Sequence, residues 1–114
     1  MPGVQTILPI MLNHVNNEKL SLEQLIKLMC ENPCKIFGIK NKGYIKEGFD
    51  ADLTIVDMHI EQTIKNETMA TKCGWTPFHD MTVKGFPIGT IINGKTVMHD
   101  GKVITEGSGQ PLEF

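Results

Sequence analysis

The spacing of the apolar residues changes near residue 40, and this change constrains the fold more than any other feature of the chain. From about Thr6 to Phe37 the apolar residues recur at helical spacing, whereas from about Tyr44 onward short β-branched runs alternate with glycine turns. The first pattern is typical of amphipathic helices and the second of strands. We therefore predict an α+β chain in which helices come first and antiparallel strands follow.

Two main helices are expected in the first part of the chain. The first should span Gln5 to about Asn16, where apolar residues form one stripe. The second should begin after Ser21, because Gln24 completes a capping box with it, and should end near residues 30–31.

A third, very short helix is predicted directly after the second. Asn32 is a typical N-cap residue, Pro33 suits the first helical position, and Gly38 after Phe37 is a typical C-terminal stop. This pattern predicts a break in the helical chain at Asn32.

In the second part of the chain, two dipeptides mark tight turns between strands. Asn93-Gly94 and Asp100-Gly101 favour two-residue hairpin loops. They separate apolar runs at residues 88–92, 96–98 and 103–104, which we interpret as a meander. Residues 107–114 have little apolar content and should form a tail that is flexible, or ordered only against another surface.

The stretch from Lys42 to Asp57 leads from glycine turns into a dense apolar run. Gly43 and Gly48 suit turns, and residues 53–56 favour a strand that is covered on both faces. Asp50 and Asp52 would share one face of an extended chain, which would suit a metal or an acid/base pair. Aspartates before a strand more often bond to the backbone of a turn, so we favour a structural role.

Three segments carry a resemblance to a known family. Residues 43–53 resemble the Gly-x-Ile-x-x-Gly-x-Asp-Ala-Asp-Leu signature that opens the C-terminal sandwich segment of the amidohydrolase superfamily. Residues 72–78, followed by Lys84-Gly85, resemble the Cys-Gly-Trp-Ser/Thr-Pro-Phe segment of dihydroorotases. Residues 2–6 with Leu8-Pro9 resemble the start of a helix in the same enzymes. Together, and in this order, the segments resemble the C-terminal portion of a class I type dihydroorotase.

The resemblance implies an architecture that is shared with a larger enzyme. Residues 1–40 would be the last helices of a metal-dependent TIM-type barrel, residues 41–106 would be strands of the accessory β-sandwich, and residues 107–114 would be a tail. The chain has 114 residues, whereas a complete barrel takes about 250. We therefore expect two partial domains and a fragment of the parent enzyme.

The resemblance also implies the chemistry of that parent. Dihydroorotases are zinc-dependent cyclic amidohydrolases that interconvert N-carbamoyl-L-aspartate and dihydroorotate in de novo pyrimidine synthesis. They use a His-x-His pair, a carboxylated lysine, two more histidines and an aspartate. The four histidines here, at positions 14, 59, 79 and 99, form no such motif. We expect no catalytic residue, metal ligand or cofactor in this chain, zinc in the parent enzyme, and no activity of the 114 residues alone.

A few residues remain as candidates for binding or catalysis. The resemblance places Pro2 and Gly3 in a loop that offers main-chain groups to the substrate, although a turn without a ligand role is equally plausible. Cys73 could be a nucleophile, but a packing cysteine is the commoner role. Trp75 and Phe78 could mark a groove, but such residues more often anchor a loop in a core.

Composition excludes several classes of partner and leaves two. A net charge of -2 and a hydrophobic fraction of 40% give no electrostatic bias toward nucleic acid or an anionic membrane. No apolar run approaches the roughly 18 residues of a membrane helix, and no secretory signal is visible, so we predict a cytoplasmic protein with reduced, packed cysteines. The expected partner is the remainder of the parent enzyme or another copy of the chain, in an oligomer with unpaired strand edges.

Two alternatives to a dihydroorotase fragment stay open. One is a non-catalytic regulatory or assembly module derived from an amidohydrolase, which would bind a partner through its exposed helices. The other is a related cyclic amidase, such as a hydantoinase. The segment from Trp75 to Phe78 argues against the second alternative.

Overall fold

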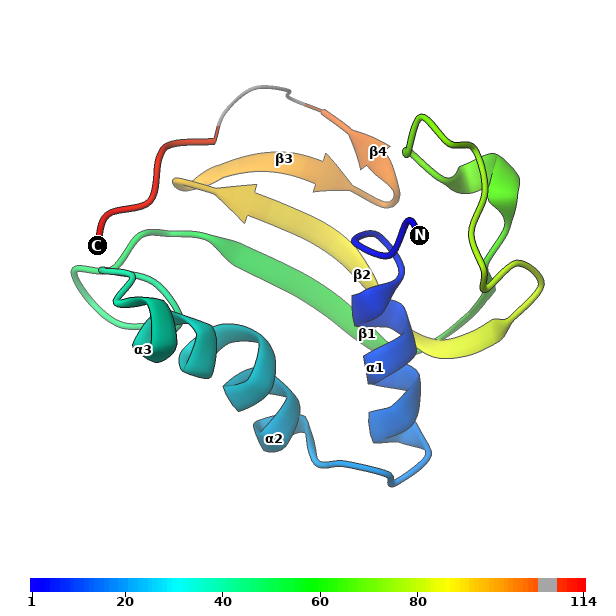
Figure 1. Cartoon of the computed structure of the whole chain (residues 1–114), viewed down its shortest axis with the longest axis horizontal. Helices are drawn as coiled ribbons and strands as arrows, with labels where there is room; N and C mark the ends of the chain where they lie inside the picture. Colours follow the sequence, from blue (N-terminus) through cyan, green and yellow to red (C-terminus); the bar gives the residue numbers. More distant parts are fainter. Residues whose placement is uncertain (105–108) are drawn as a thin grey trace. The chain divides into compact units, whose positions relative to one another are not determined.

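A computed structural model describes residues 1–104 and 109–114, which fall into two compact units (Figure 1). The first unit holds residues 1–20 and 56–87, and the second holds residues 21–55 and 88–114. Strands β1 (Leu53–Thr63) and β2 (Thr82–Ile92) each contribute residues to both units. The partial domains expected from the sequence, at residues 1–40 and 41–106, are defined by the architecture of a larger parent enzyme and therefore stay a prediction.

Helix α1 (Ile7–Asn16) opens the first unit. It starts two residues later than predicted, because the backbone N–H groups of Thr6 and Ile7 both donate to the carbonyl of Gly3, at 3.2 and 3.0 Å, and form a turn there. The buried side chains of this unit come from the helix, from the loop after β1 and from β2; they are Thr6, Pro9, Leu12, Ile64, Thr76 and Val83.

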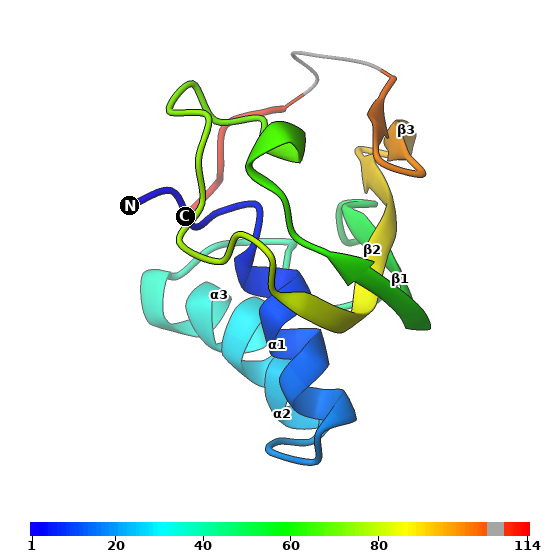
Figure 2. The ribbon, with the colours of Figure 1, turned by 90° about the vertical axis from the view of Figure 1, so that its right-hand side faces the viewer.

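Helix α1 lies beside the strands of the first unit (Figure 2). Two of its asparagines bond to the backbone of these strands. Asn13 accepts a hydrogen bond from the backbone N–H of Lys84 at 3.0 Å. The side-chain amide of Asn16 donates to the carbonyls of Lys84 and Met58, at 2.7 and 3.0 Å. Gly85 permits this approach, since a Cβ there would lie 2.9 Å from Cβ of Leu12. The helix therefore packs on β2 without an intervening side chain.

In the second unit, the predicted second and third helices form one continuous run. Helix α2 (Leu22–Ile26) begins with the expected capping box, continues as the π-helical turn η1 (Lys27–Glu31), and passes into α3 (Asn32–Phe37). The predicted break at Asn32 is wrong, because its backbone is helical and its N–H donates to the carbonyl of Lys27, five residues back. The wider turn accommodates Pro33, which has no N–H to donate. Gly38 ends the run in the left-handed conformation, as predicted.

The four strands form a sheet in the order β1-β2-β3-β4, where β3 is Lys95–His99 and β4 is Lys102–Val103. The pairs β2–β3 and β3–β4 are antiparallel, with a bulge between Thr90 and Ile91. Both predicted tight turns are present, with positive φ at residues 93–94 and 100–101, which suits two-residue hairpin loops. Strand β2 begins six residues earlier than the predicted run at residue 88.

Strand β1 is less covered than its sequence predicts. Its apolar start predicts burial on both faces, yet Thr54 is exposed and the side chain of Ile55 keeps 47% of its surface accessible in this chain. The expectation of a tail falls partly on residues 107–108, which lie outside the described residues. Residues 109–114 have no regular structure, and the carbonyl of Glu113 accepts a hydrogen bond from the N–H of Lys40 at 2.8 Å. Across residues 1–104 and 109–114, no helix has the length and apolar character to cross a membrane.

Candidate functional site

The turn before α1 holds the two residues that the sequence singled out, Pro2 and Gly3. Both are half-buried, and the carbonyl of Gly3 accepts from the backbone N–H groups of Thr6 and Ile7 and from Oγ1 of Thr6 at 3.3 Å. Thr6 is only 2% exposed, so this carbonyl faces into the turn. Because Pro2 has no N–H, the main-chain groups that Pro2 and Gly3 themselves could offer to a ligand are the N–H of Gly3 and the carbonyl of Pro2.

Gln5 ties this turn to a segment that lies far away in sequence. Its side-chain amide donates to the carbonyl of Thr68 at 3.0 Å and accepts from the N–H of Ala70 at 2.8 Å. Thr68 ends the short 3₁₀ turn η2 (Asn66–Thr68). One side chain therefore satisfies two backbone groups and holds the loop after β1 beside the start of α1, within the first unit.

The loop that follows η2 is anchored by Thr76 and not by Trp75, while Phe78 is half-buried. Thr76 is 4% exposed, its N–H donates to Oδ1 of Asn66 at 2.8 Å, and its Oγ1 accepts from the N–H of Phe78 at 3.2 Å. Trp75 is 45% exposed, so the prediction that Trp75 anchors the loop is wrong. The indole is instead an apolar surface that a ligand or another part of a protein could cover.

His79 closes the same loop. Its Nδ1 accepts from the N–H of Asn66 at 3.0 Å, and its Nε2 lies 3.5 Å from Oδ2 of Asp80. An Nδ1 that accepts a hydrogen bond carries no proton, which assigns the proton of the neutral ring to Nε2. Asp80 also pairs with Lys65, and this hydrogen bond lowers the pKa of Asp80 and raises the pKa of Lys65. The imidazole therefore stabilises the loop, and its hydrogen-bond partners do not orient it toward a metal site.

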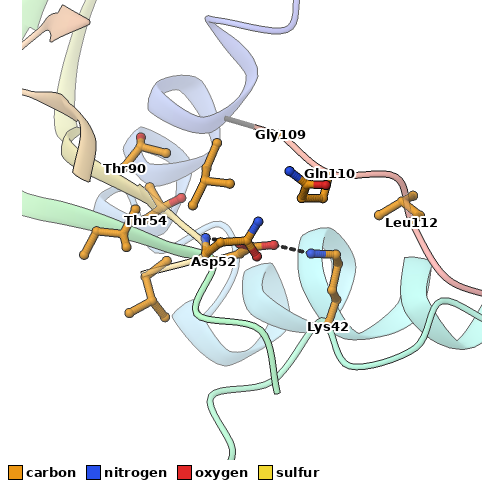
Figure 3. Close-up of a pocket in the computed structure, with 11 residues that line it drawn as sticks. Lys42, Asp52, Thr54, Thr90, Gly109, Gln110 and Leu112 are labelled. Carbon is orange, nitrogen blue, oxygen red and sulfur yellow. Dashed lines mark hydrogen bonds and ion pairs between the residues drawn. The ribbon is translucent and has the colours of Figure 1, made fainter. Parts of the chain in front are cut away.

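In the second unit, Lys42 pairs with both aspartates that precede β1. Its Nζ lies 3.1 Å from Oδ2 of Asp50. It also contacts Oδ2 of Asp52 (Figure 3). Hydrogen bonds from Lys42 and from the N–H of Asn93 lower the pKa of Asp52, and the bond to Asp52 raises the pKa of Lys42. Both groups stay charged near neutral pH, which suits a structural pair better than proton transfer. This agrees with the predicted structural role of the aspartates.

A pocket of about 330 Å³ lies beside this pair (Figure 3). Its polar end is formed by Lys42 and Asp52, and residues 109–112 of the tail lie across from them. The remaining lining comes from the start of β1 and the end of β2, namely Leu53, Thr54, Thr90, Ile91, Ile92 and Asn93. With its charges paired, the pocket lacks a free group that could act as a nucleophile or a base.

A metal centre is not assembled by the described part of the chain. No three His, Cys, Asp or Glu side chains within residues 1–104 and 109–114 come together in a way that could hold an ion. His14 has a buried Nδ1 without a hydrogen-bond partner among these residues, but it sits on α1 without a second ligand beside it. The residues present therefore do not fit the zinc that the family resemblance implies.

The cysteines differ from the packed thiols that the sequence predicts. All three are free, Cys73 and Cys30 are exposed, and Cys34 is half-buried. The backbone N–H of Cys73 donates to Oγ1 of Thr71 at 3.4 Å, which fixes its loop but does not activate its thiol. Cys73 is thus neither a packing residue nor a supported nucleophile.

The amide side chains that hold these loops were missed from the sequence. Gln5, Asn13, Asn16 and Asn66 each bond to backbone groups that are at least ten residues away. Hydrophobic spacing carries no signal for such contacts, because the partners are set by tertiary packing. The only local hint is that Gln5 lies within residues 2–6, a segment that resembles the family.

Comparisons with known proteins agree on one superfamily. The sequence pattern of the amidohydrolase family matches residues 4–97. Dihydroorotase of Pyrococcus furiosus is 46% identical over 112 residues, which are 98% of this chain and 27% of that protein. L-hydantoinase of Paenarthrobacter aurescens is 42% identical over 111 residues, which are 95% of this chain and 24% of that protein.

Solved structures give the same result. The L-hydantoinase (dihydropyrimidinase) structure from Arthrobacter aurescens matches with a TM-score of 0.92 and 40% identity, over 96% of this chain and 25% of that chain. The chain thus spans about a quarter of the length of the curated relatives that it matches, and it corresponds to a C-terminal part of them. Identities of 46% and 42% to two different enzymes do not by themselves separate their substrates.

Proposed function

Because the chain belongs to the amidohydrolase family, we propose that its 114 residues function as the C-terminal part of a dihydroorotase. The observation that carries this proposal is the 46% identity to a dihydroorotase over 98% of the chain. The proposed reaction is the interconversion of N-carbamoyl-L-aspartate and dihydroorotate in pyrimidine synthesis. The Cys73 to Phe78 segment, which resembles dihydroorotases, favours this reaction over hydantoin hydrolysis.

In the proposed enzyme, this chain would position main-chain groups at the substrate and would not provide ligands to the metal. The zinc that the family resemblance implies would be held by other residues of the enzyme, because the residues described here do not fit it. Helices α1, α2 and α3 would be the last barrel helices, and β1 to β4 would be strands of an accessory sandwich. We also propose a cytoplasmic location, which cell fractionation would test.

The role of this chain at the substrate would be played by the main chain of Pro2 and Gly3. The carbonyl of Gly3 is engaged by Thr6 and Ile7, which leaves the N–H of Gly3 as the group of this residue that would donate to a carbonyl of the dihydropyrimidine ring. Gln5 holds this turn beside Thr68 and Ala70, which limits its movement. A donor fixed in this way binds without losing further conformational entropy.

A chimeric enzyme tests the proposed reaction. In it, this chain replaces the matched C-terminal segment of the Pyrococcus furiosus dihydroorotase, and hydrolysis of dihydroorotate and of a substituted hydantoin is measured. We expect activity on dihydroorotate and much less on the hydantoin. A chimera that folds, binds zinc and prefers the hydantoin would assign the chain to the alternative cyclic amidase.

Two substitutions in that chimera test the main-chain contact. Gly3→Pro removes the N–H of residue 3, whereas Gly3→Ala keeps it, and an added Cβ would meet only Met1 Cε at 4.0 Å. We expect Gly3→Pro to lower kcat/KM by roughly 10–100-fold, because a substrate carbonyl that is left without its donor costs about 1–3 kcal/mol, and Gly3→Ala to change it little. Equal effects of the two variants would argue for a turn without a ligand role.

The isolated chain should be inactive. Purified chain with added zinc is expected to give no hydrolysis of dihydroorotate above the buffer rate, because the described residues form no metal site. Hydrolysis that co-elutes with the chain and is lost on chelation would refute this.

The rival function, a non-catalytic assembly module, is favoured by one observation. The run from α2 to α3 exposes large apolar side chains, including Leu28 at 56%, Ile36 at 74% and Phe37 at 66%. Such a surface favours a partner or another copy of the chain. Sedimentation velocity should therefore show association at high concentration, which Ile36→Lys with Phe37→Lys should reduce and Ile45→Lys should not. A monomer at every concentration would count against this surface as an interface.

A further inference from the structure

Two thiols lie on the same side of the helical run in the second unit. Cys30 belongs to the π-helical turn η1 and Cys34 to α3, four residues further along the continuous run. In an α-helix, side chains at this spacing lie on one side with Cβ atoms about 5–6 Å apart, and the wider π-helical turn that holds Cys30 leaves the two cysteines just short of one turn apart. Cys30 is exposed and Cys34 is half-buried, so the pair can be reached from solvent at the Cys30 side.

The turn at Gly43 closes the other side of the pair. A Cβ on Gly43 would lie 2.9 Å from Sγ of Cys34 and 2.9 Å from the carbonyl oxygen of Cys30. The backbone of this turn therefore covers Cys34 directly and limits the rotamers of its thiol. Partial burial, together with the neighbouring Cys34 and Glu31, raises the pKa of Cys30.

The spacing distinguishes two kinds of thiol chemistry. A disulfide needs Cβ atoms about 3.5–4.5 Å apart, which is closer than two helical residues at this spacing lie. An ion that bridges two sulfurs at about 2.3 Å each spans a longer gap without moving the helix. Soft ions select thiolates over oxygen ligands, and no third ligand is grouped with the pair in the described ranges.

We propose that Cys30 and Cys34 form a two-thiolate site for a thiophilic metal ion of the Cu(I) or Hg(II) class. Each thiol loses its proton as its sulfur binds the ion, so one ion enters and two protons leave, without oxidation or reduction. The turn at Gly43 fixes the position of the Cys34 thiol. The exposed thiol of Cys30 binds the ion from the solvent side. The site depends on this chain alone and does not rest on the proposed reaction.

The third cysteine supplies a matched control, because Cys73 is exposed and lies in the first unit. In a Cys73→Ser chain, titration with Hg(II) against a competing monothiol should saturate at one ion per chain, release two protons, and protect both remaining thiols from alkylation, as read by mass spectrometry. In Cys30→Ser/Cys73→Ser and Cys34→Ser/Cys73→Ser chains, the affinity should fall by about 100-fold or more, since the second sulfur no longer binds intramolecularly. Circular dichroism checks that each variant is folded.

Three results would overturn the site. They are saturation at two ions per Cys73→Ser chain, saturation at half an ion with dimer formation, and single-thiol variants that bind as tightly as the pair. A mild disulfide-forming oxidant provides a second measurement that needs no further variant. The spacing predicts no Cys30–Cys34 disulfide within a chain, and its rapid formation would contradict the geometry on which the site depends.

Discussion

The backbone N–H of Asn93 donates a hydrogen bond to Oδ1 of Asp52 at 2.9 Å, while Lys42 occupies the other oxygen of the same carboxylate. Asp52 precedes β1, and Asn93 begins the turn between β2 and β3. One carboxylate thus joins two segments that are about forty residues apart. The adjacent N–H of Gly94 reinforces this by donating to the carbonyl of Ala51 at 3.0 Å.

The Asp52 contacts predict how stability depends on pH. Because the pKa of Asp52 is lowered in the folded chain, its stabilisation is present above the ordinary aspartate pKa of about 3.9 and is lost as the pH falls through the lowered value. Asp52→Asn should therefore unfold at lower urea concentration near neutral pH and lose less stability on acidification. Glu61→Gln, at an exposed position of β1, is the control. Parallel pH profiles for the wild-type and Asp52→Asn chains would contradict the prediction.

The two asparagines of α1 predict opposite tolerance to the same substitution. Asn16 acts as a donor to two carbonyls, so Asn16→Asp removes both bonds and places a carboxylate against carbonyl oxygens. Asn13 acts as an acceptor, which aspartate preserves. We expect Asn16→Asp to cost about 1–3 kcal/mol in free energy of unfolding and Asn13→Asp clearly less. Both lie in the last turns of α1, so the helix dipole affects them alike. Equal losses in urea unfolding would show that these bonds do not govern docking of the helix.

Alanine substitutions at Gly85 and Gly94 allow the effect of steric contact to be distinguished from the effect of backbone strain. Both have positive φ, +100° and +78°, but a Cβ would clash with Leu12 at Gly85 and meet nothing within 4 Å at Gly94. Alanine at either position should cost about 1–3 kcal/mol of strain. Gly85→Ala should cost about 1–3 kcal/mol more, because α1 must move away from β2. Similar midpoints of thermal unfolding for the two variants would argue against close contact at Gly85.

Asn66 predicts a local effect in the loop that carries Trp75. Asn66→Ala removes the acceptor of the buried Thr76 N–H, which should cost about 1–3 kcal/mol, whereas Asn66→Asp keeps an acceptor oxygen. Amide hydrogen exchange at Thr76 should accelerate in the alanine variant and not in the aspartate variant. Unchanged exchange at Thr76 in Asn66→Ala would mean that the loop is held by other contacts.

Apart from the N-cap signal at Asn32, the helix and turn signals that can be read locally agree with the structure. The capping box of Ser21 and Gln24, the stop at Gly38 and the turn at Asn93-Gly94 are all present. Each depends on residues within a few positions of one another, so the sequence contains all the information that is needed. The order of helices before strands follows from the same local spacing.

The sequence was less informative where distant contacts decide the structure. Strand β2 extends back to Thr82 through Gly85 and Pro87, residues that normally weaken a strand, because asparagines on α1 bond to its backbone. The sequence favours Trp75 as an anchor of its loop in a core, but Thr76 is the buried residue and is held through Asn66. The family could be identified from three short segments, while the contacts that hold the Gly3 turn could not.

The π-helical turn has a consequence for how the helical run faces its surroundings. One residue beyond the α-helical count shifts everything after it by about 100° around the helix axis, since each residue of an α-helix turns by that angle. The side chains of Ile36 and Phe37 are therefore oriented differently around the helix axis than they would be in an unbroken α-helix that starts at Leu22. Deleting one residue within 27–31 would restore the orientation that an unbroken helix gives to these side chains. The length of this turn therefore determines which surface α3 presents to a neighbour.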